Sequence, residues 1–234
     1  MHQNLTLASM HAADMAALTP FLSEHFVRRG EVLTEQGARV DDVYFPTSAY
    51  LANTVTFRDG RSAETFVLGS DGVSGLAPFL ADSPCAWAVE VRSSGNVIRV
   101  PAAALRRQVE ESPGLRQLLL NLTSDYQTQA ALGVACASLH AIAPRLAKFI
   151  LLASDRAGIE EMHLTQEDLA ALLGVQRTTV NAAALELKKA STITYSRGVI
   201  RITNRVQLMR TACECYALQR ASAAKGDTLT AVSK

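Results

Sequence analysis

The residues best suited to recognise another molecule follow Gly174, within the stretch LTQEDLAALLGVQRTTVNAAALEL (164–187). Arg can form two hydrogen bonds with a guanine edge, Asn or Gln can do the same with adenine, and a Thr methyl group can contact that of thymine. These residue types gather just after the glycine, at Gln176, Arg177, Thr178, Thr179 and Asn181. If these side chains point outward from the start of one helix, they would contact DNA bases in the major groove. Thr179 would lie further from the bases and donate a hydrogen bond to a phosphate.

Two short helical patterns flank Gly174 and would hold these side chains in place. Thr165 is a natural N-cap for the first helix, and the polar and acidic residues after it suit the positive helix end. Gly174 ends that helix because glycine tolerates a left-handed backbone conformation. A second helix starts near Gln176, and the small Ala170 lets the two helix axes approach. We therefore predict a helix-turn-helix. The residues predicted to face inward are Leu169, Leu172, Leu173, Val180, Ala183, Ala184 and Leu187.

A small hairpin is predicted directly after these helices. The sequence ITYSRGVIRI (193–202) alternates around Arg197-Gly198, and a wing of this kind would place Arg197 at its tip, against the DNA backbone. Two-helix corners with polar surfaces also occur in bundles that never contact DNA, so the hairpin and the nearby positive charge decide in favour of DNA. Such charge supplies salt-sensitive affinity that does not depend on sequence. The basic residues concerned are Lys188, Lys189, Arg201 and Arg205.

Charge is unevenly distributed along the chain, although the net charge is only +1. Residues 1–140 contain ten Lys and Arg against fourteen Asp and Glu, whereas residues 141–210 contain ten against six. An acidic N-terminal part and a basic C-terminal part suggest two separate functions, the second of which involves binding a polyanion. Residues 1–20 lack a basic leader with a long apolar core, and the uncharged apolar stretch at 130–144 is too short to span a bilayer. We therefore expect a cytoplasmic protein that does not bind membranes.

The first half of the chain is predicted to contain short strands after a helical lead-in at residues 8–27. An Asp-Gly turn in NTVTFRDGRSAETFV (53–67) predicts one hairpin, and Ser-Ser-Gly-Asn in AVEVRSSGNVIRV (88–100) predicts another. Short strands separated by Gly, Asp and Pro are typical of an antiparallel sandwich or roll.

A long helix is predicted from about Leu115 to His140, followed by an amphipathic helix over 144–158. Apolar residues form a stripe on the long helix, close to a heptad seam. The stripe can pack on the chain's own β domain, or it can pair with the same helix of a second copy across a two-fold axis. We favour the pairing. The members of the stripe are residues 115, 118, 119, 122, 126, 132, 136 and 139.

Cysteines and histidines offer no familiar catalytic or metal pattern. The cysteines, at 85, 136, 213 and 215, include no Cys-x-x-Cys pair, and isolated cysteines in a cytosolic chain are usually small buried hydrophobic residues. The five histidines form no His-x-His pair, and neither a Gly-x-Ser-x-Gly elbow nor a phosphate loop is present. We therefore expect no metal, no cofactor and no catalytic residue, and the protein is not expected to be an enzyme.

The order of β roll, long helix and winged helix-turn-helix resembles the cyclic-AMP-receptor and fumarate-nitrate-reduction regulator (Crp/Fnr) superfamily of bacterial transcription factors. The resemblance covers roughly residues 20–216 and is strongest over 164–202, with support from RRGEVLTEQGARVDDVYFPTSAYL, FVLGSDGVSGL and CECY. It implies an α+β protein with an N-terminal antiparallel β roll like the cyclic-nucleotide-binding jelly roll, a dimerisation helix and a C-terminal winged helix-turn-helix. It also implies a homodimer that binds near-palindromic double-stranded DNA, with RNA polymerase as a candidate partner.

The ligand of the roll is not implied by the resemblance. Members that bind cyclic AMP carry Gly-Glu-Leu, whose Glu holds the ribose, followed by Arg-Ser/Thr-Ala, whose Arg pairs with the phosphate. The matching stretches here are GVSGL (72–76), which contains no Glu, and PCAW (84–87), in which Pro84 stands about where the Arg belongs. Proline can neither pair with a phosphate nor donate an N–H. Arg92 is the nearest alternative cation, so we predict that cyclic AMP is not bound in the usual way and that the effector is unknown.

Other sensors of this family are also poorly supported. Residues 1–40 contain no Cys for an iron–sulfur centre, and lone His11, His25 or Cys85 are not favoured as haem ligands.

These expectations divide the chain into a sensor-like β roll (1–111), a dimerisation helix (112–141), a winged helix-turn-helix (142–218) and a flexible tail (219–234). The alternative is a module that does not bind DNA. In it, the roll would hold a small molecule or a protein, and the winged unit would be a protein-contact surface.

Overall fold

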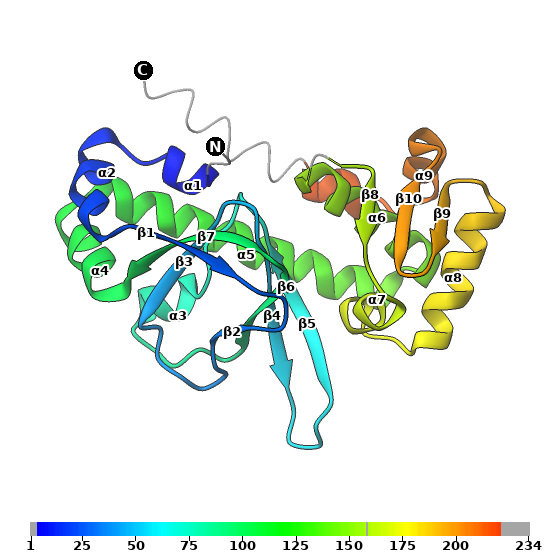
Figure 1. The fold of residues 1–234 in the computed structure, drawn as a ribbon, viewed down its shortest axis with the longest axis horizontal. Coiled ribbons are helices and arrows are strands. Elements are labelled where there is room, and N and C mark those ends of the chain that lie inside the picture. The colour runs from blue at the N-terminus through cyan, green and yellow to red at the C-terminus, as the bar shows by residue number, and fades with distance from the viewer. Residues whose placement is uncertain (1–3, 158, 221–234) are drawn as a thin grey trace. The chain divides into compact units, whose positions relative to one another are not determined.

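The computed structural model describes residues 4–157 and 159–220, and the chain forms two compact units that divide after Tyr126 (Figure 1). In the described ranges, no helix combines the length and the apolar character needed to cross a membrane.

The N-terminal unit starts with helices α1 (Leu5–Ala8) and α2 (Ala12–Leu18) and the 3-10 turn η1 (Thr19–Phe21). Strand β1 (Ser23–Val27) follows, so the helical lead-in predicted over residues 8–27 is wrong for its last five residues. The reason is tertiary, because every residue of β1 pairs with β7.

Strands β1 to β7 form two antiparallel sheets, ordered β1-β7-β3 and β2-β6-β4-β5, which confirms the predicted antiparallel roll. Side chains from both sheets share an apolar core that includes Val27, Leu51, Val91 and Val97. The further elements are β2 (Val32–Thr34), β3 (Asp42–Pro46), β4 (Tyr50–Thr56), β5 (Ser62–Leu68), α3 (Leu76–Ala81), β6 (Ala88–Ser93) and β7 (Gly95–Pro101).

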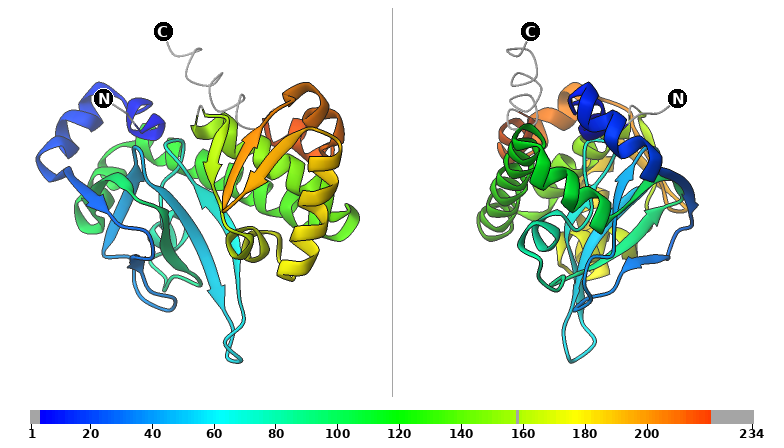
Figure 2. Two further views of the ribbon diagram at one scale, coloured as in Figure 1. Left: turned by 45° about the vertical axis from the view of Figure 1, so that its right-hand side comes forward. Right: turned by 90° about the vertical axis from the view of Figure 1, so that its left-hand side faces the viewer.

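The two predicted hairpins have different outcomes. Strands β4 and β5 pair around the Asp59-Gly60 turn as predicted, and Figures 1 and 2 show this hairpin extending beyond the rest of its unit. The prediction of a hairpin over 88–100 is wrong, because β6 and β7 belong to different sheets. A Cβ atom at Gly95 would come within 2.4 Å of the Ala49 nitrogen, so glycine permits the close approach at which the chain changes sheets.

Helix α5 (Pro113–Leu139) is the predicted long helix and follows α4 (Ala102–Glu111), which lies beside α2. Most of its predicted apolar stripe covers the chain itself. Leu115 and Leu119 are buried in the core of the N-terminal unit. The preference for pairing that stripe with a second copy is therefore wrong for its buried members, because the roll has an apolar face of its own that α5 covers, whereas Leu139 at the far end of the stripe is 78% exposed. The stripe residues that pack against this core are Leu118, Leu122 and Tyr126, while Cys136 is buried in the C-terminal unit.

The C-terminal unit is built around α6 (Ile142–Ala157), which starts two residues before the predicted Pro144. Ile150 of α6 joins Leu169, Leu187 and Ile200 in one fully buried core. Residues 215–220 are helical, so the flexible tail predicted from 219 starts in a helix, and its residues 221–234 lie outside the described part. The further elements are β8 (Glu161–His163), α7 (Gln166–Leu173), α8 (Arg177–Lys189), β9 (Ile193–Ser196), β10 (Val199–Ile202) and α9 (Arg205–Thr211).

Candidate nucleic-acid interface

Helix α7 begins and ends as the sequence predicts. The Thr165 hydroxyl accepts a hydrogen bond from the Asp168 N–H (3.1 Å), and the Asp168 carboxylate accepts one from the Thr165 N–H (2.8 Å). This reciprocal capping box satisfies two backbone N–H groups that have no partner inside the helix. Gly174 ends the helix with φ = 65°, in the left-handed region.

The orientation of α8 is set by its buried side. Val180, Ala183, Ala184 and Leu187 are buried in the core of the unit, which confirms the predicted inner face of this helix. Gln176 stands at the N-cap position. The five residues predicted to read DNA lie at this end, and all five are exposed: Gln176, Arg177, Thr178, Thr179 and Asn181.

A small hydrogen-bond network links α8 to the first turn of α7. Arg177 Nε donates to Gln166 Oε1 (2.8 Å), and Gln166 Nε2 donates to Asn181 Oδ1 (3.1 Å). The Arg177 guanidinium also pairs with Glu167 at 3.0 Å. The sequence assigned Gln166 and Glu167 only to the helix start, and the corner at Gly174 brings them against Arg177 and Asn181.

The predicted wing is present and carries Arg197 at its tip. Strands β9 and β10 pair on either side of Arg197 (φ 50°) and Gly198 (φ 77°). Gly198 O accepts a hydrogen bond from the N–H of Leu164 (2.8 Å), next to the N-cap of α7. Within the part of the chain that the structure describes, no side chain pairs with Arg197, and it is exposed. Strand β8, which the sequence did not predict, pairs with β10 as the third strand.

Tyr195 fixes the wing to the helix-turn-helix. Its hydroxyl donates to Leu164 O at 3.1 Å. Burial, followed by the nearby carboxylates of Asp168 and Glu167, raises the pKa of Tyr195, so the hydroxyl keeps the proton that this bond needs.

Several of the basic residues expected to add positive charge already have partners. Arg201 pairs with Glu161, and Arg205 pairs with Asp155. Lys188 Nζ donates to Tyr195 O at 3.2 Å. Arg205 is thus part of the structure of the unit, and Arg197 is the better candidate for a backbone contact.

Comparison with known proteins agrees with this architecture. The profile of the Crp-like helix-turn-helix domain matches residues 144–211, and that of the cyclic nucleotide-binding domain matches residues 24–112. The chain belongs to the Crp/Fnr superfamily of transcriptional regulators.

Individual relatives of this Crp/Fnr protein are distant. The HTH-type transcriptional regulator Cmr of Mycobacterium tuberculosis is 23% identical over 197 residues, covering 84% of this chain and 79% of that protein. The CRP-like cAMP-activated global transcriptional regulator of the same species is 23% identical over 205 residues, covering 85% and 92%. FixK2 from Bradyrhizobium japonicum superposes with a TM-score of 0.71 at 19% identity, covering 82% of this chain and 98% of that structure.

The residues compared above with the cyclic-nucleotide cassette are buried or paired in this Crp/Fnr protein. Val73, where cyclic-AMP-binding members carry Glu, is 1% exposed within the apolar core. Arg92 lies on β6, and its guanidinium pairs with Glu64 at 2.7 Å and with Glu90 at 3.0 Å. One cation between two carboxylates gives this group a net negative charge, which disfavours a phosphate.

Backbone groups of the loop between β5 and α3 also have partners within the N-terminal unit. The Val73 N–H donates to the Tyr126 hydroxyl (2.7 Å), and the Gly72 carbonyl accepts from the Asn4 amide (2.9 Å). Ser74 Oγ accepts from the Tyr44 N–H at 2.9 Å. A ligand that used the Val73 N–H would have to displace Tyr126.

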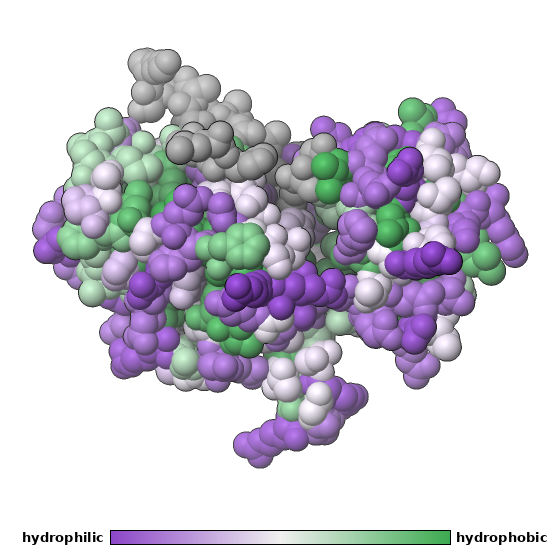
Figure 3. All heavy atoms as spheres, viewed as in Figure 1, coloured by the Kyte–Doolittle hydropathy of each residue, from purple (hydrophilic) through white to green (hydrophobic). Residues whose placement is uncertain are grey.

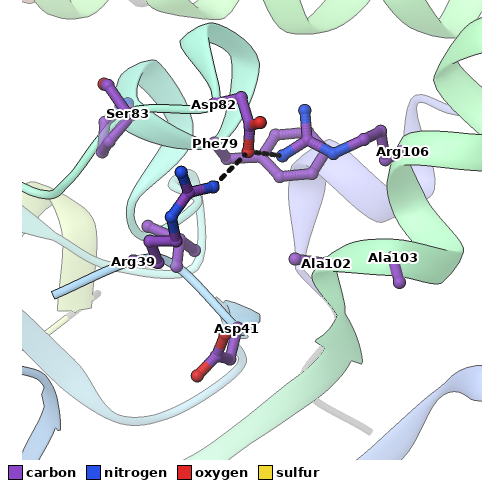
Figure 4. A pocket seen from close by; sticks show the side chains of 10 residues that line it. Arg39, Asp41, Phe79, Asp82, Ser83, Ala102, Ala103 and Arg106 are labelled. Atoms are coloured by element: carbon purple, nitrogen blue, oxygen red, sulfur yellow. Dashed lines mark hydrogen bonds and ion pairs between the residues drawn. The ribbon is translucent and has the colours of Figure 1, made fainter.

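A surface pocket of about 220 Å³ lies beside α3 and α4 (Figure 4). Figure 4 shows the Asp82 carboxylate between the guanidinium groups of Arg106 (3.1 Å) and Arg39 (3.4 Å), and Arg106 also lies over the Phe79 ring. Neither Val73 nor Pro84 lines this pocket, and both of its arginines are paired.

Three of the four cysteines are not isolated, which corrects the expectation from their spacing. Cys136, Cys213 and Cys215 are buried together beside His140 in the C-terminal unit, while Cys85 is buried in the roll. Burial, then hydrogen bonding to Cys136, raises the pKa of Cys213 to about 12. Burial of Cys136 by itself would raise the pKa of its thiol. A hydrogen bond with His140 and the charge of Lys148 outweigh that effect, so the pKa of Cys136 is lowered. The spacings Cys-x3-His and Cys-x-Cys could have singled out each pair of residues, although not that the two pairs meet.

Replacing Gly174 by alanine is expected to destabilise the C-terminal unit by about 1–2 kcal/mol. The cost comes from placing a residue with a Cβ atom in the left-handed backbone conformation, since an added Cβ would meet no neighbouring atom. No atom lies within 4 Å of a Cβ at Gly174. Gly133, inside α5, also has nothing within 4 Å, and its φ is not positive, so Gly133→Ala should stabilise by about 0.5–1 kcal/mol. Urea unfolding of both variants measures the two changes. Equal effects of the same sign would contradict the assignment of Gly174 as a left-handed helix stop.

Proposed function

We propose that this protein is a homodimeric, sequence-specific DNA-binding regulator that reads a near-palindromic operator through α8 and the wing. The observation that carries the proposal is the exposed group of base-reading residue types at the start of α8, on a helix whose opposite side is fully buried. The residues proposed to contact DNA are Gln176, Arg177, Thr178, Thr179, Asn181 and Arg197.

The chemistry of the surface supports this assignment. Arg177, Asn181 and Gln176 can each form paired hydrogen bonds with base edges. The start of α8 has no side-chain cap and favours a phosphate, and Arg197 can contact the neighbouring backbone. On the face drawn in Figure 3, most of the C-terminal unit has a hydrophilic surface, as expected of a unit that meets a hydrated polyanion.

A second face of α5 supports homodimerisation through this helix, which we place at residues 112–141. Positions 120, 124, 127, 131, 134 and 138 follow alternating steps of four and three residues, and all six are exposed. Leu120 and Val134 on this face are 46% and 69% exposed, and between them Ala131 and Ser124 are small. An exposed heptad seam of this kind is what a parallel partner helix would cover.

Fluorescence anisotropy and solution mass test the proposal together. We expect a mass near twice 25.1 kDa, and an affinity for duplexes selected from a random pool that falls steeply as salt is added. An intact dimer that changes the anisotropy of no duplex, even at low salt, would instead favour a protein-contact role for the winged unit. A monomer that does not bind DNA would contradict both the DNA-binding function and the protein-contact alternative.

We also propose that the roll is a degenerate nucleotide-binding domain that does not respond to cyclic AMP. Isothermal titration with cyclic AMP should give no sub-millimolar binding, because Val73 and Pro84 replace the ribose and phosphate ligands and Arg92 is already paired. Arg92→Gln serves as the matched variant, since its loss should not change the titration. Binding of one cyclic AMP per protomer that Arg92→Gln abolishes would show that Arg92 has taken over the phosphate.

A further inference from the structure

Four potential metal ligands of the C-terminal unit converge from two places in the chain. Cys136 lies in the last turn of α5, and His140 follows the last residue of that helix, where its N–H donates to Cys136 O at 3.2 Å. Cys213 and Cys215 lie just after α9, at the start of the helical residues 215–220. One ligand atom from each of the four residues lies within 4.8 Å of all the others.

The distances within this cluster match a tetrahedral site. Zinc–sulfur bonds of about 2.3 Å and zinc–nitrogen bonds of about 2.0–2.1 Å place two tetrahedral sulfurs about 3.8 Å apart, and a sulfur and a nitrogen about 3.6 Å apart. The Sγ atoms of Cys136 and Cys213 are 3.6 Å apart. Cys215 Sγ is 3.6 Å from His140 Nδ1.

Groups around the cluster complete the pattern of a metal site. His140 turns Nδ1 toward the thiols, while its Nε2 lies 3.9 Å from the Glu214 carboxylate. A carboxylate on the outer nitrogen commonly orients a histidine that binds a metal, and here the 80% exposed Glu214 lies at an ion-pair distance that is longer than a hydrogen bond. Lys148 Nζ is 3.4 Å from Cys136 Sγ and would balance the single negative charge of three thiolates around a divalent cation.

We propose that Cys136, His140, Cys213 and Cys215 form a Cys3His site for Zn²⁺. Three sulfur ligands and one imidazole in a tetrahedral arrangement are typical of structural zinc. Four protein ligands leave no open position, so the ion holds structure and does not catalyse a reaction. On binding, each thiol loses its proton to solvent and the thiolate donates a lone pair to the metal.

Zinc at this site would fasten the segment after α9 to the end of α5. Without the metal, this segment is held by the burial of Tyr216 in the core of the C-terminal unit and by polar contacts. The Cys213 N–H reaches Pro144 O at 3.4 Å, the Tyr216 hydroxyl donates to Asp155 (2.8 Å), and Arg220 lies 3.8 Å from the same carboxylate. The inference concerns the C-terminal unit alone and does not rest on DNA binding.

Zinc content of the full-length, tag-free protein tests the site directly. Protein prepared under a phosphine reductant with zinc supplied, then desalted, should retain one zinc per chain by mass spectrometry of the metal. His140→Ala and Cys215→Ala should lose it, whereas Cys85→Ala, which removes the buried cysteine of the other unit, should retain it. Chelation should lower the thermal midpoint of the wild-type protein and leave that of His140→Ala unchanged.

Cobalt substitution distinguishes ligands from residues that merely support the fold. Tetrahedral Co²⁺ should show visible absorption and thiolate charge-transfer bands whose intensity follows the number of sulfur ligands. His140→Cys should still bind, with charge-transfer absorption about a third higher, as four thiolates replace three. The proposal fails if the reduced wild-type protein retains no stoichiometric zinc or cobalt, if His140→Ala and Cys215→Ala retain it, or if the protein instead forms a Cys136–Cys213 disulfide that excludes metal.

Discussion

Val134→Glu is expected to convert the proposed dimer into a monomer of 25.1 kDa. Val134 is 69% exposed on α5 and is the larger-exposure apolar member of the seam that we assign to the dimer interface. Two valine side chains that lose their burial cost about 3–6 kcal/mol, and the two carboxylates add repulsion across the two-fold axis. The dimer dissociation constant should therefore rise by about two to four powers of ten. Sedimentation or light scattering over a concentration series measures this change.

The matched control for this variant is Phe57→Glu. Phe57 is 61% exposed at the tip of the β4–β5 hairpin, so the control removes a similarly exposed apolar side chain and adds the same charge away from α5. It should leave the mass unchanged. If Val134→Glu remained a dimer, or if Phe57→Glu alone became monomeric, the seam on α5 would not be the interface.

Arg177→Ala is expected to weaken binding to the selected operator far more than binding to unrelated duplexes. A lost bidentate contact with guanine costs about 1–3 kcal/mol, and a symmetric dimer loses it twice, so the total is about 2–6 kcal/mol. The pair between Arg177 and Glu167 does not oppose the contact strongly, because both side chains are about two-thirds exposed and such pairs contribute about 0–1 kcal/mol. Competition anisotropy with operator and scrambled duplexes measures the loss of preference.

Arg197→Ala provides the contrasting result. As a contact to the phosphate backbone, Arg197 should affect all sequences alike, and its loss from both protomers should reduce the slope of log affinity against log salt by about 1.8. Arg58→Ala, at the exposed hairpin tip of the roll, removes the same charge and should change neither quantity. If Arg177→Ala lowered affinity for every duplex equally, Arg177 would be a backbone contact and would not read a base.

The helix-turn-helix could be predicted closely because its determinants are local. Thr165 and Gly174 mark the start and end of α7 through capping and backbone conformation, which act over a few residues. The periodicity of Val180, Ala183 and Leu187 then fixes which side of α8 is buried, and so which side is exposed. The hairpin at Asp59-Gly60 and the wing at Arg197-Gly198 follow for the same reason, since their turns are set by the residues within them.

Only the tertiary structure decided the features that depend on distant partners. The sequence does not show that β6 and β7 belong to different sheets, or that Leu115 and Leu119 pack on the roll while Leu120 and Val134 stay exposed. Nor does it bring Cys136 to Cys213, which are 77 residues apart along the chain. Periodicity defines the faces of a helix but not what covers each face, because that depends on which segments, distant in sequence, fold against it.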